Sequence, residues 1–385
     1  MKKSNSFISS IALLAGLTAC SSNDLPVQHS DQYDNITFTV ETQKVATRAN
    51  EYEKYNPSQH PLQMGVFGYQ AETLASDHTL LDDFNNRQVT FDESQKNWGY
   101  GEPKKWEEYK ATRFFDFLAF MPYHENTENT GNPASITIQS DAAKNTETYT
   151  LSVPYNPTTY ASTSSTTSAS PFLFDSKSAP IICALPEHRE VKNADGTKKS
   201  FDHTIRFKFD QTLTGYKLLF KLDPKMGAIR QFHIKKVQIT GEIPSSCNIT
   251  RKFSYDKNTQ EWTAGEIQWK DIQTITKDNP VDIPFKETVV TSTDYAQWGG
   301  TFYTIPYAAF EPTIQVTYDV VMKAQDETIV TRNDVTSSII LNKSNFGSFN
   351  SSATATIYPI RILIQPRYLY VLTDQDAYTG HLLID

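Results

Sequence analysis

Histidine, cysteine and carboxylate residues decide first whether this sequence encodes catalytic chemistry. The eight histidines are scattered and form none of the closely spaced pairs that bind zinc. The zinc-protease pattern HExxH, the hydrolase pattern GxSxG and a phosphate-binding glycine loop are all absent from the sequence. Gly99-Tyr100-Gly101 is a lone GxG, and His203 precedes a strand, where a hydrogen-bonded structural histidine is the commoner case. The sequence therefore predicts a protein that is not an enzyme.

One acidic segment near the C-terminus weakly resembles a calcium-binding loop. Asp374-Gln375-Asp376 is followed by Gly380, but a third acidic ligand and the closing glutamate are missing at the required spacing. A solvated turn is the better explanation of these residues. We expect no metal and no cofactor.

The first cysteine lies in a segment that indicates export. Lys2 and Lys3 precede an apolar run, 7–17, which is typical of a signal peptide and too short to span a bilayer. The signal peptide then covers 1–19, because Leu17-Thr18-Ala19-Cys20 resembles a bacterial lipobox. The resemblance implies cleavage before Cys20, lipid on its sulfur and an acylated amine, which together anchor the chain stably in a membrane.

The other two cysteines are Cys183 and Cys247. An oxidising compartment would permit a disulfide between them. Their wide separation in the sequence favours two buried thiols instead.

Composition restricts both the class of partner and the fold. The 385 residues carry 36 Lys and Arg against 44 Asp and Glu, a formal charge of −8 that argues against a nucleic-acid partner. The 22 Phe, 20 Tyr and 5 Trp favour β structure. The length predicts two domains.

Alternating apolar and polar residues recur along the chain and predict half-buried strands. Ile36, Phe38 and Val40 point one way and the residues between them the other, and the pattern returns at 205–209, 216–222 and 314–322. The nearly apolar stretch 112–122 suits a strand buried on both faces. Turn residues separate these runs, and no long helical pattern is present, which favours β-sandwiches. We expect a tether and first strand over 20–49, an N-terminal sandwich over 50–200 and a C-terminal sandwich over 201–385.

Several motifs occur in a recognisable order. The lipobox precedes the strand of Ile36, and Thr47-Arg48-Ala49 follows it. Farther along come an aromatic strand ending at Met121-Pro122 and a strand that opens with Phe201-Asp202-His203. This order resembles the fimbrillin family of Bacteroidales, the subunits of type V pili. The resemblance implies an all-β chain of two tandem transthyretin-like antiparallel β-sandwiches, exported as a lipoprotein to the outer membrane and exposed on the cell surface in a pilus used for adhesion.

The resemblance also implies how such a subunit assembles. An arginine-specific protease cuts between Arg48 and Ala49 and releases the first strand, whose Ile36, Phe38 and Val40 fill a groove. A strand from another pilin subunit then occupies that groove. The donor candidates are apolar residues near the C-terminus, among which the sequence does not choose: Ile360, Ile362, Ile364, Leu369, Val371, Leu382 and Ile384.

Two alternatives stay open at this point. An anchor subunit that is never cut would keep the first strand in its sheet permanently. An outer-membrane adhesin or glycan-binding lipoprotein that does not polymerise would instead stack exposed aromatic rings on sugars. Trp98 and Trp106 are the best candidates for such exposed rings, because glycines and lysines flank them.

Overall fold

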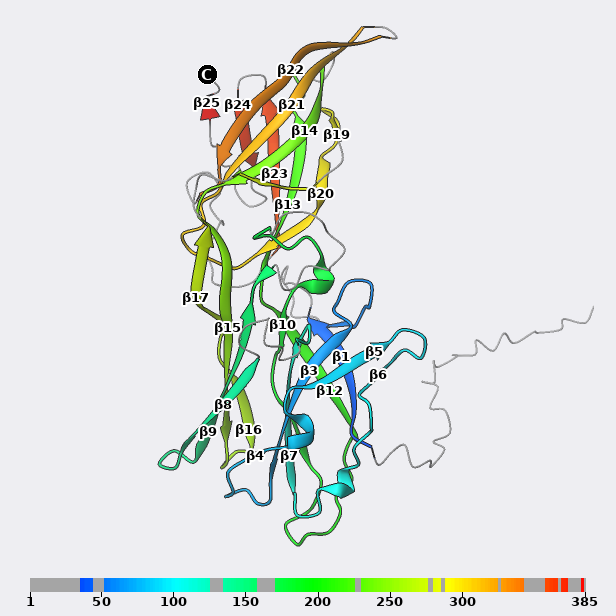
Figure 1. Ribbon diagram of the computed structural model, residues 1–385, viewed down its shortest axis with the longest axis vertical. Coiled ribbons are helices and arrows are strands. Elements are labelled where there is room, and N and C mark those ends of the chain that lie inside the picture. Colours follow the sequence, from blue (N-terminus) through cyan, green and yellow to red (C-terminus); the bar gives the residue numbers. More distant parts are fainter. Residues whose placement is uncertain are drawn as a thin grey trace, which may run out of the picture.

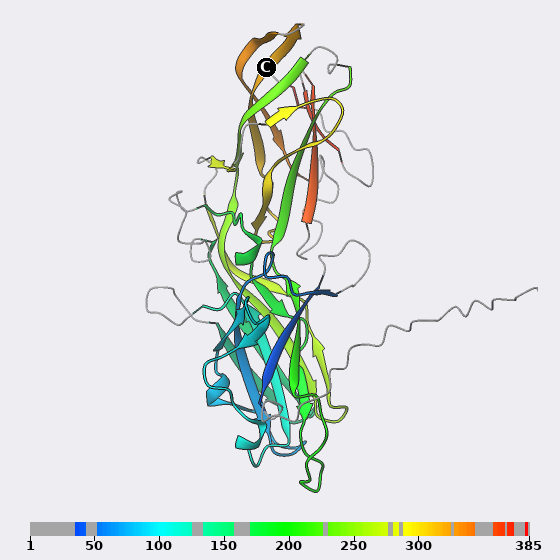
Figure 2. The same ribbon diagram turned by 90° about the vertical axis from the view of Figure 1, so that its right-hand side faces the viewer.

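The computed structural model describes residues 35–43, 52–124, 134–157, 170–225, 230–275, 280–284, 288–324, 327–342, 357–365, 368–372 and 382–383. These residues form two β-rich bodies placed end to end along the long axis of the molecule (Figure 1). The view turned by 90° shows the same elongated arrangement (Figure 2). The prediction of an all-β fold is confirmed, while the transthyretin-like topology of the two sandwiches stays a prediction.

The helical elements with described bounds are three single turns. They are η2 (Asp82–Phe84), η3 (Trp106–Glu108) and η4 (Ser176–Ser178). None of the described helices has the length and apolar character needed to cross a membrane.

A ten-stranded sheet that curls on itself is the basis of the N-terminal body. Its path runs β2-β1-β12-β10-β7-β3-β5-β6, with β11 paired to β7 and β4 paired to β3. Near the two ends of this path, β6 and β1 lie against each other, so the curl encloses side chains of its own. The strands are β1 (Thr37–Gln43), β2 (Tyr52–Lys54), β3 (Gln63–Ala71), β4 (Thr79–Leu80), β5 (Arg87–Asp92), β6 (Asn97–Gly99), β7 (Phe114–Met121), β10 (Ile181–Cys183), β11 (Glu187–Glu190) and β12 (Thr204–Gln211).

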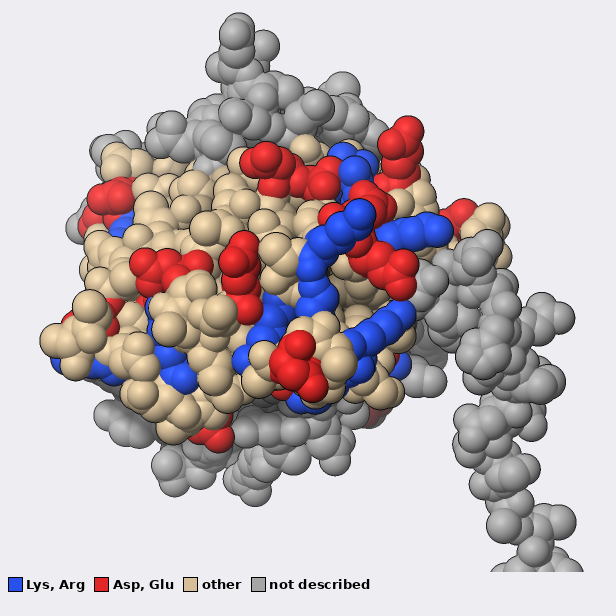
Figure 3. All heavy atoms as spheres, turned by 90° about the horizontal axis from the view of Figure 1, so that it is seen from below, with Lys and Arg blue, Asp and Glu red and all other residues tan. Residues whose placement is uncertain are grey.

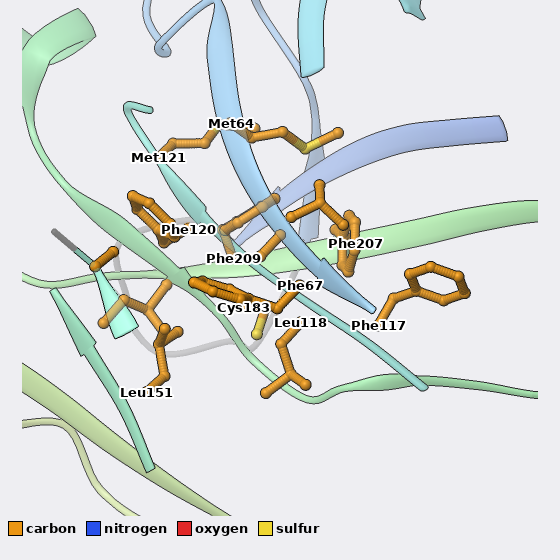
Figure 4. Close-up of a cluster of buried hydrophobic side chains, with 14 of the residues drawn as sticks. Met64, Phe67, Phe117, Leu118, Phe120, Met121, Leu151, Cys183, Phe207 and Phe209 are labelled. Carbon is orange, nitrogen blue, oxygen red and sulfur yellow. The ribbon is translucent and has the colours of Figure 1, made fainter. Parts of the chain in front are cut away.

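A second, five-stranded sheet packs on the outside of this curl. It contains β8 (Ser135–Asp141), β9 (Thr146–Tyr155), β15 (Ile243–Asp256), β16 (Glu261–Ala264) and β17 (Gln268–Ile275). The ring of Tyr69 on β3 meets that of Tyr149 on β9 edge-on, with centroids 5.0 Å apart. Figure 4 shows part of the buried cluster, in which Phe67, Phe120 and Phe207 come from three different strands of the curled sheet.

The central strand β7 is buried along its whole length, as its apolar sequence predicts. Phe117 lies inside the curl, where its ring contacts that of Phe84 at 5.5 Å. The neighbouring Asp116 faces the second sheet and accepts a hydrogen bond from Trp262 Nε1 at 2.8 Å. Because each face of β7 meets a different layer, both sets of alternating side chains are shielded from water.

Two five-stranded sheets make up the C-terminal body. One has the order β20-β13-β23-β24-β25, and the other has β18-β14-β21-β22 with β19 beside β14. Their apolar faces share a core that includes Phe220, Ile234, Ile314 and Ile362. The strands are β13 (Thr214–Leu222), β14 (Arg230–Thr240), β18 (Val281–Asp282), β19 (Thr288–Val290), β20 (Ala296–Thr304), β21 (Thr313–Ala324), β22 (Glu327–Ile340), β23 (Ile357–Gln365), β24 (Tyr368–Leu372) and β25 (Leu382–Leu383).

The two bodies do not divide at residue 200, where the turn signals place the boundary. β12 follows that turn but belongs to the N-terminal sheet, between β1 and β10. The chain enters the C-terminal body with β13 and β14, returns with β15, β16 and β17, and leaves again with β18. Turn residues mark where the chain reverses, whereas strand pairing determines the body to which each strand belongs. The segment 201–385 is therefore shared between both bodies.

Candidate functional site: the slot of the first strand

The first strand, β1, lies one position from the edge of the curled sheet. Its long neighbour is β12, with which it pairs in parallel from Thr37 opposite Thr204 to Thr42 opposite Phe209. On its other side it pairs antiparallel with the three-residue β2, from Glu41 opposite Lys54 to Gln43 opposite Tyr52. The backbone of β1 is thus held mainly by one partner strand.

The apolar side chains of this segment point into the curl. Ile36, Phe38 and Val40 are 1%, 4% and 4% exposed, whereas Thr37 and Thr39 on the other face are only half-buried. The alternation read from the sequence is therefore the alternation of the strand. Burial of each such side chain stabilises the body by about 1.5–3 kcal/mol relative to leaving it in water.

Phe38 occupies the centre of an aromatic cluster. Its ring centroid lies 5.8 Å from Phe84, 5.4 Å from Tyr100, 5.8 Å from Phe117 and 5.9 Å from Phe207. The first three contacts are edge-to-face, and the fourth is stacked. We call the space that these four rings line the first-strand slot.

Polar contacts fix the beginning of the strand. Ile36 N–H donates to the carbonyl of Lys104 at 2.8 Å, and the hydroxyl of Tyr100 donates to the carbonyl of Ile36 at 2.7 Å. Burial raises the pKa of the Tyr100 hydroxyl to about 12, so it keeps its proton and remains a donor at neutral pH. The Thr37 and Thr204 hydroxyls lie 3.0 Å apart and bridge β1 to β12.

The chemistry of the first-strand slot suits a β-strand as its occupant. Without β1, the strand β12 would expose a row of unpaired N–H and C=O groups beside an apolar ring cluster. A guest strand with large apolar residues at every second position could pair with these backbone groups and also fill the space among the rings. An isolated small molecule would fill only the space among the rings and would leave the backbone of β12 unpaired.

The C-terminal body contains a second strand in an equivalent setting. β23 pairs in parallel with β13, and β13 follows β12 directly in the sequence. Among the strands whose pairing is described, these are the two parallel pairs. Ile360, Ile362 and Ile364 of β23 are each fully buried in the core of their own body.

The remaining donor candidates lie beyond β23. The register places Leu369 and Val371 of β24 opposite Ile364 and Ile362, and Leu382 of β25 opposite Leu369. Ile384 lies outside the described residues, as do Cys20, Arg48 and Ala49 and the segment Asp374-Gln375-Asp376. The structure therefore describes the first strand and most donor candidates, but neither the processing site nor the lipid site.

A buried polar network joins the curl to the second sheet, and sequence reasoning missed it. His78 Nε2 lies 2.7 Å from Asp116 Oδ2 on β7, and its Nδ1 lies 2.6 Å from Glu147 Oε2 on β9. Lys257 Nζ lies 3.0 Å from the other Glu147 oxygen, and His188 Nδ1 lies 2.7 Å from Asp116 Oδ1. These residues are far apart in the sequence, so no local spacing could have revealed the network.

The network holds opposite charges together out of water. Burial alone would lower the pKa of His78, but hydrogen bonds to Asp116 and Glu147 raise it to about 9. Burial opposes ionisation of both carboxyls, yet the histidine contacts keep the pKa of Asp116 low and lower that of Glu147 to about 2. His78 is therefore cationic between two carboxylates at neutral pH, and it clamps the two layers together.

Two sequence expectations about exposed groups need correction. Trp98 and Trp106 are buried, at 8% and 6% exposure, because they pack against Tyr55 and Phe115 respectively. Neither offers an open ring face of the kind expected for sugar stacking.

Cys183 and Cys247 are both buried free thiols, in agreement with the preference against a disulfide.

A metal site finds no support in the part of the chain that the structure describes. There, no three or more His, Cys, Asp or Glu side chains are arranged to hold a metal ion. The carboxylates of the buried network are instead occupied by His78, His188 and Lys257.

Comparisons with known proteins find no matching family model and no matching curated protein. Among solved structures, the chain is similar to a fimbrial protein from Bacteroides vulgatus at 15% identity and a TM-score of 0.41, over 91% of this chain and 98% of that one. It is similar to a proposed cell adhesion protein from Bacteroides ovatus at 12% identity and a TM-score of 0.39, over 92% of this chain and 99% of that one. It is also similar to the fimbrial anchor protein Mfa2 from Porphyromonas gingivalis, at 10% identity and a TM-score of 0.31, over 90% of this chain and 98% of that one. These TM-scores are low, and the proposal below rests on the strands of this chain alone.

Proposed function

We propose that this chain is a structural subunit of a cell-surface pilus used for adhesion, and that it assembles when its first strand is exchanged for a strand of another subunit. The observation that carries the proposal is the placement of β1. Ile36, Phe38 and Val40 fill a lined slot, while the backbone of β1 has one long partner, β12, and one short partner, β2. Such a strand can be replaced by another of the same pattern without rebuilding the body.

Processing provides the trigger in this proposal. The chain is exported, acylated at Cys20 and carried to the outer membrane, as the lipobox implies. An arginine-specific protease then cuts between Arg48 and Ala49. Because the cut lies between β1 and β2, it separates the first strand covalently from the rest of the body and leaves β2 attached.

The guest strand must obey the geometry that β1 leaves behind. We propose that it takes the same direction as β1 and runs parallel to β12, as β23 runs parallel to β13. It also needs large apolar side chains at alternate positions to refill the space among the rings around Phe38. These two conditions together give the exchange its direction and its register.

The donor is best sought beyond β23. Ile360, Ile362 and Ile364 hold the C-terminal core together between β13 and β24, so their withdrawal would open that body. β24 and β25 lie at the end of the sheet, and their removal leaves β23 paired with β13. We therefore favour the segment of Leu369, Val371, Leu382 and Ile384 as the donor.

Replacement of Arg48 by alanine tests the trigger. The purified chain is incubated with an arginine-specific protease, and polymers are scored as ladders in denaturing gels and as filaments by electron microscopy. We expect Arg48→Ala to abolish both, while Lys44→Ala, a matched change in the same segment, leaves both intact. Normal polymers from Arg48→Ala would show that this processing site is wrong.

Truncation after Gln365 tests the donor. The shortened chain should keep its native melting transition and still be cut at Arg48, but it should form no ladder with itself. It should also cap the growth of full-length polymers, because its own slot remains able to accept a donor. Full polymerisation by the truncated chain would exclude the segment 366–385 as donor.

The alternative is an outer-membrane adhesin, or an anchor, that does not polymerise. The enclosure of Phe38 by four rings favours it, because a strand held so firmly also suits a permanent member of the sheet. In that case the protein recovered from cells begins at acylated Cys20. A free N-terminal Ala49 would support the pilus subunit instead.

A further inference from the structure

The lower end of the N-terminal body contains a cavity that the strand-exchange proposal does not use. The cavity measures about 230 Å³ and lies between η3 and the loop that joins β11 to β12. In Figure 1 this loop (green) and η3 (cyan) lie at the end farthest from the C-terminal body. Figure 3 views the same end from below and shows lysine and arginine side chains running across it among acidic groups.

Three aromatic residues provide the apolar part of the cavity. Trp106 lines it and is itself packed edge-on against Phe201, with ring centroids 5.0 Å apart. Tyr109 and Phe201 are half-buried, so part of each ring faces the cavity and solvent. The Tyr109 hydroxyl donates to Asp83 Oδ2 at 2.8 Å, which holds this ring in place.

Three lysines surround this aromatic part. Lys110, Lys192 and Lys198 all line the cavity, against the single carboxylate of Glu107. Glu107 lies 3.3 Å from Lys198 Nζ in a largely exposed pair, while Lys192 Nζ donates to the carbonyl of Lys110. Within the described residues, no carboxylate lies in ion-pair range of Lys110 or Lys192. The cavity therefore has an excess of positive charge.

The backbone places two of these lysines in direct opposition. Lys192 and Lys198 form an antiparallel bridge across a tight hairpin that turns at Gly196, where φ is +83°. Like charges directly opposite each other on paired strands repel and destabilise the pair. An anion bound between the two ammonium groups would relieve that repulsion.

We propose that this cavity binds the acidic ring of an anionic sugar, with the carboxylate between Lys192 and Lys198 and the apolar face of the ring against Tyr109 and Phe201. The proposal rests on the surface-adhesion part of the proposed function. The cavity is smaller than the ~300–1,000 Å³ of pockets for drug-sized ligands, so it suits one ring rather than a chain. An acidic peptide side chain would use the lysines but leave the aromatic rings without a role.

A matched pair of sugars tests this assignment on the purified full chain. Methyl glucuronide and methyl glucoside differ at one carbon, and binding is followed by calorimetry at low and high salt. We expect the glucuronide to bind, the glucoside to bind at least tenfold more weakly, and salt to weaken the glucuronide complex. Equal binding of the two sugars, or no binding of either, would overturn the assignment.

Lysine variants locate the site. Lys192→Gln and Lys198→Gln should each weaken glucuronide binding about tenfold, the value for one charge-assisted hydrogen bond. Lys144→Gln, at an exposed lysine in the turn between β8 and β9, should leave binding unchanged. Unchanged binding in both cavity variants would place the sugar elsewhere. If an oligoglutamate displaces the sugar and itself binds more tightly, the ligand of this cavity is an acidic peptide and the sugar assignment is wrong.

Filament formation separates this proposal from the previous one. The lysine variants should be cut by the arginine-specific protease and should polymerise normally, because the substitutions lie on a surface hairpin. They do not alter Trp106, whose ring contacts that of Phe117 in the first-strand slot with centroids 6.1 Å apart. Loss of sugar binding with normal filaments is the result we expect from them. If the unmodified chain forms filaments but does not bind the glucuronide, only the sugar-site proposal is wrong. If it binds the sugar but forms no filaments, only the pilus proposal is wrong.

Discussion

Phe38 of β1 lies stacked on Phe207 of β12, with ring centroids 5.9 Å apart and planes inclined by 7°. The backbone register places Ile205, not Phe207, opposite Phe38, so the stacked pair crosses diagonally between the two parallel strands. Diagonal neighbours on paired strands remain within reach of aromatic rings. The first strand is thus held to its body through this side-chain pair as well as through its backbone.

Removal of the Phe38 ring should weaken the N-terminal body strongly. Phe38→Ala leaves a cavity among four aromatic rings, and such changes typically lower the free energy of unfolding by about 3–5 kcal/mol. The measurement is urea unfolding followed by fluorescence. Thr39→Ala, on the half-buried face of the same strand, should cost less than about 1 kcal/mol. Similar losses in the two variants would mean that Phe38 is not at the centre of a core.

A corresponding change in β23 tests whether that strand is a permanent part of its sheet. Ile362→Ala should lower the free energy of unfolding by about 2–5 kcal/mol, because the side chain is fully buried in the core between the two sheets of the C-terminal body. Leu363→Ala is the same kind of truncation on the opposite, half-buried face and should cost less. If Ile362→Ala were neutral, β23 would regain its place among the donor candidates.

The buried network around His78 makes stability depend on pH in both directions. The raised pKa of His78, from 6.5 to about 9, contributes stability that is complete below 6.5 and is lost as the pH rises through about 9. The lowered pKa values of Asp116 and Glu147 contribute stability that is present above 4.5 and is lost as the pH falls toward about 2. Stability should therefore be greatest between 4.5 and 6.5.

His78→Gln should remove the alkaline part of this dependence. The variant loses the cation between Asp116 and Glu147, so it should be less stable than the unmodified chain by about 3–5 kcal/mol near pH 6. The unfolding midpoint, measured from pH 3 to pH 10, should then fall less between 6.5 and 9. An alkaline loss in His78→Gln as steep as that of the unmodified chain would contradict this explanation.

The two cysteines should be unreactive in the native protein. Burial raises the pKa of both the Cys183 and Cys247 thiols to about 12, and the two side chains are 0% and 6% exposed. Because the thiolate is the nucleophile, iodoacetamide at pH 8 should label neither residue in the folded chain and both in denaturant. Mass spectrometry of the labelled peptides distinguishes these outcomes. Rapid native labelling of Cys183 would show that β10 opens readily.

Properties determined by neighbouring residues were predictable from the sequence. The alternation of Ile205 and Phe207 with Arg206 and Lys208 predicted a strand with one buried face, and β12 has that pattern. The same reading identified the buried face of β1 before any partner was known. A period of two is a property of a single strand, so it does not depend on tertiary contacts.

Properties determined by distant partners were not predictable. The boundary near residue 200 failed because the partners of β12 and β15 lie far away in the sequence. Trp106 seemed exposed from its polar neighbours, whereas Phe115 and Phe201 enclose it. His78, Asp116 and Glu147 meet only where the curled sheet packs against the second sheet. No local pattern records any of these contacts.

The repeated crossing of the chain between the two bodies has a mechanical consequence. Among the described strands, the chain passes from one body to the other after β12, β14 and β17. Tension applied along the long axis is consequently divided among several connections instead of being concentrated in a single hinge. We expect a pulled molecule to yield by unzipping within one sheet while its halves stay joined, a behaviour suited to a load-carrying fibre under flow.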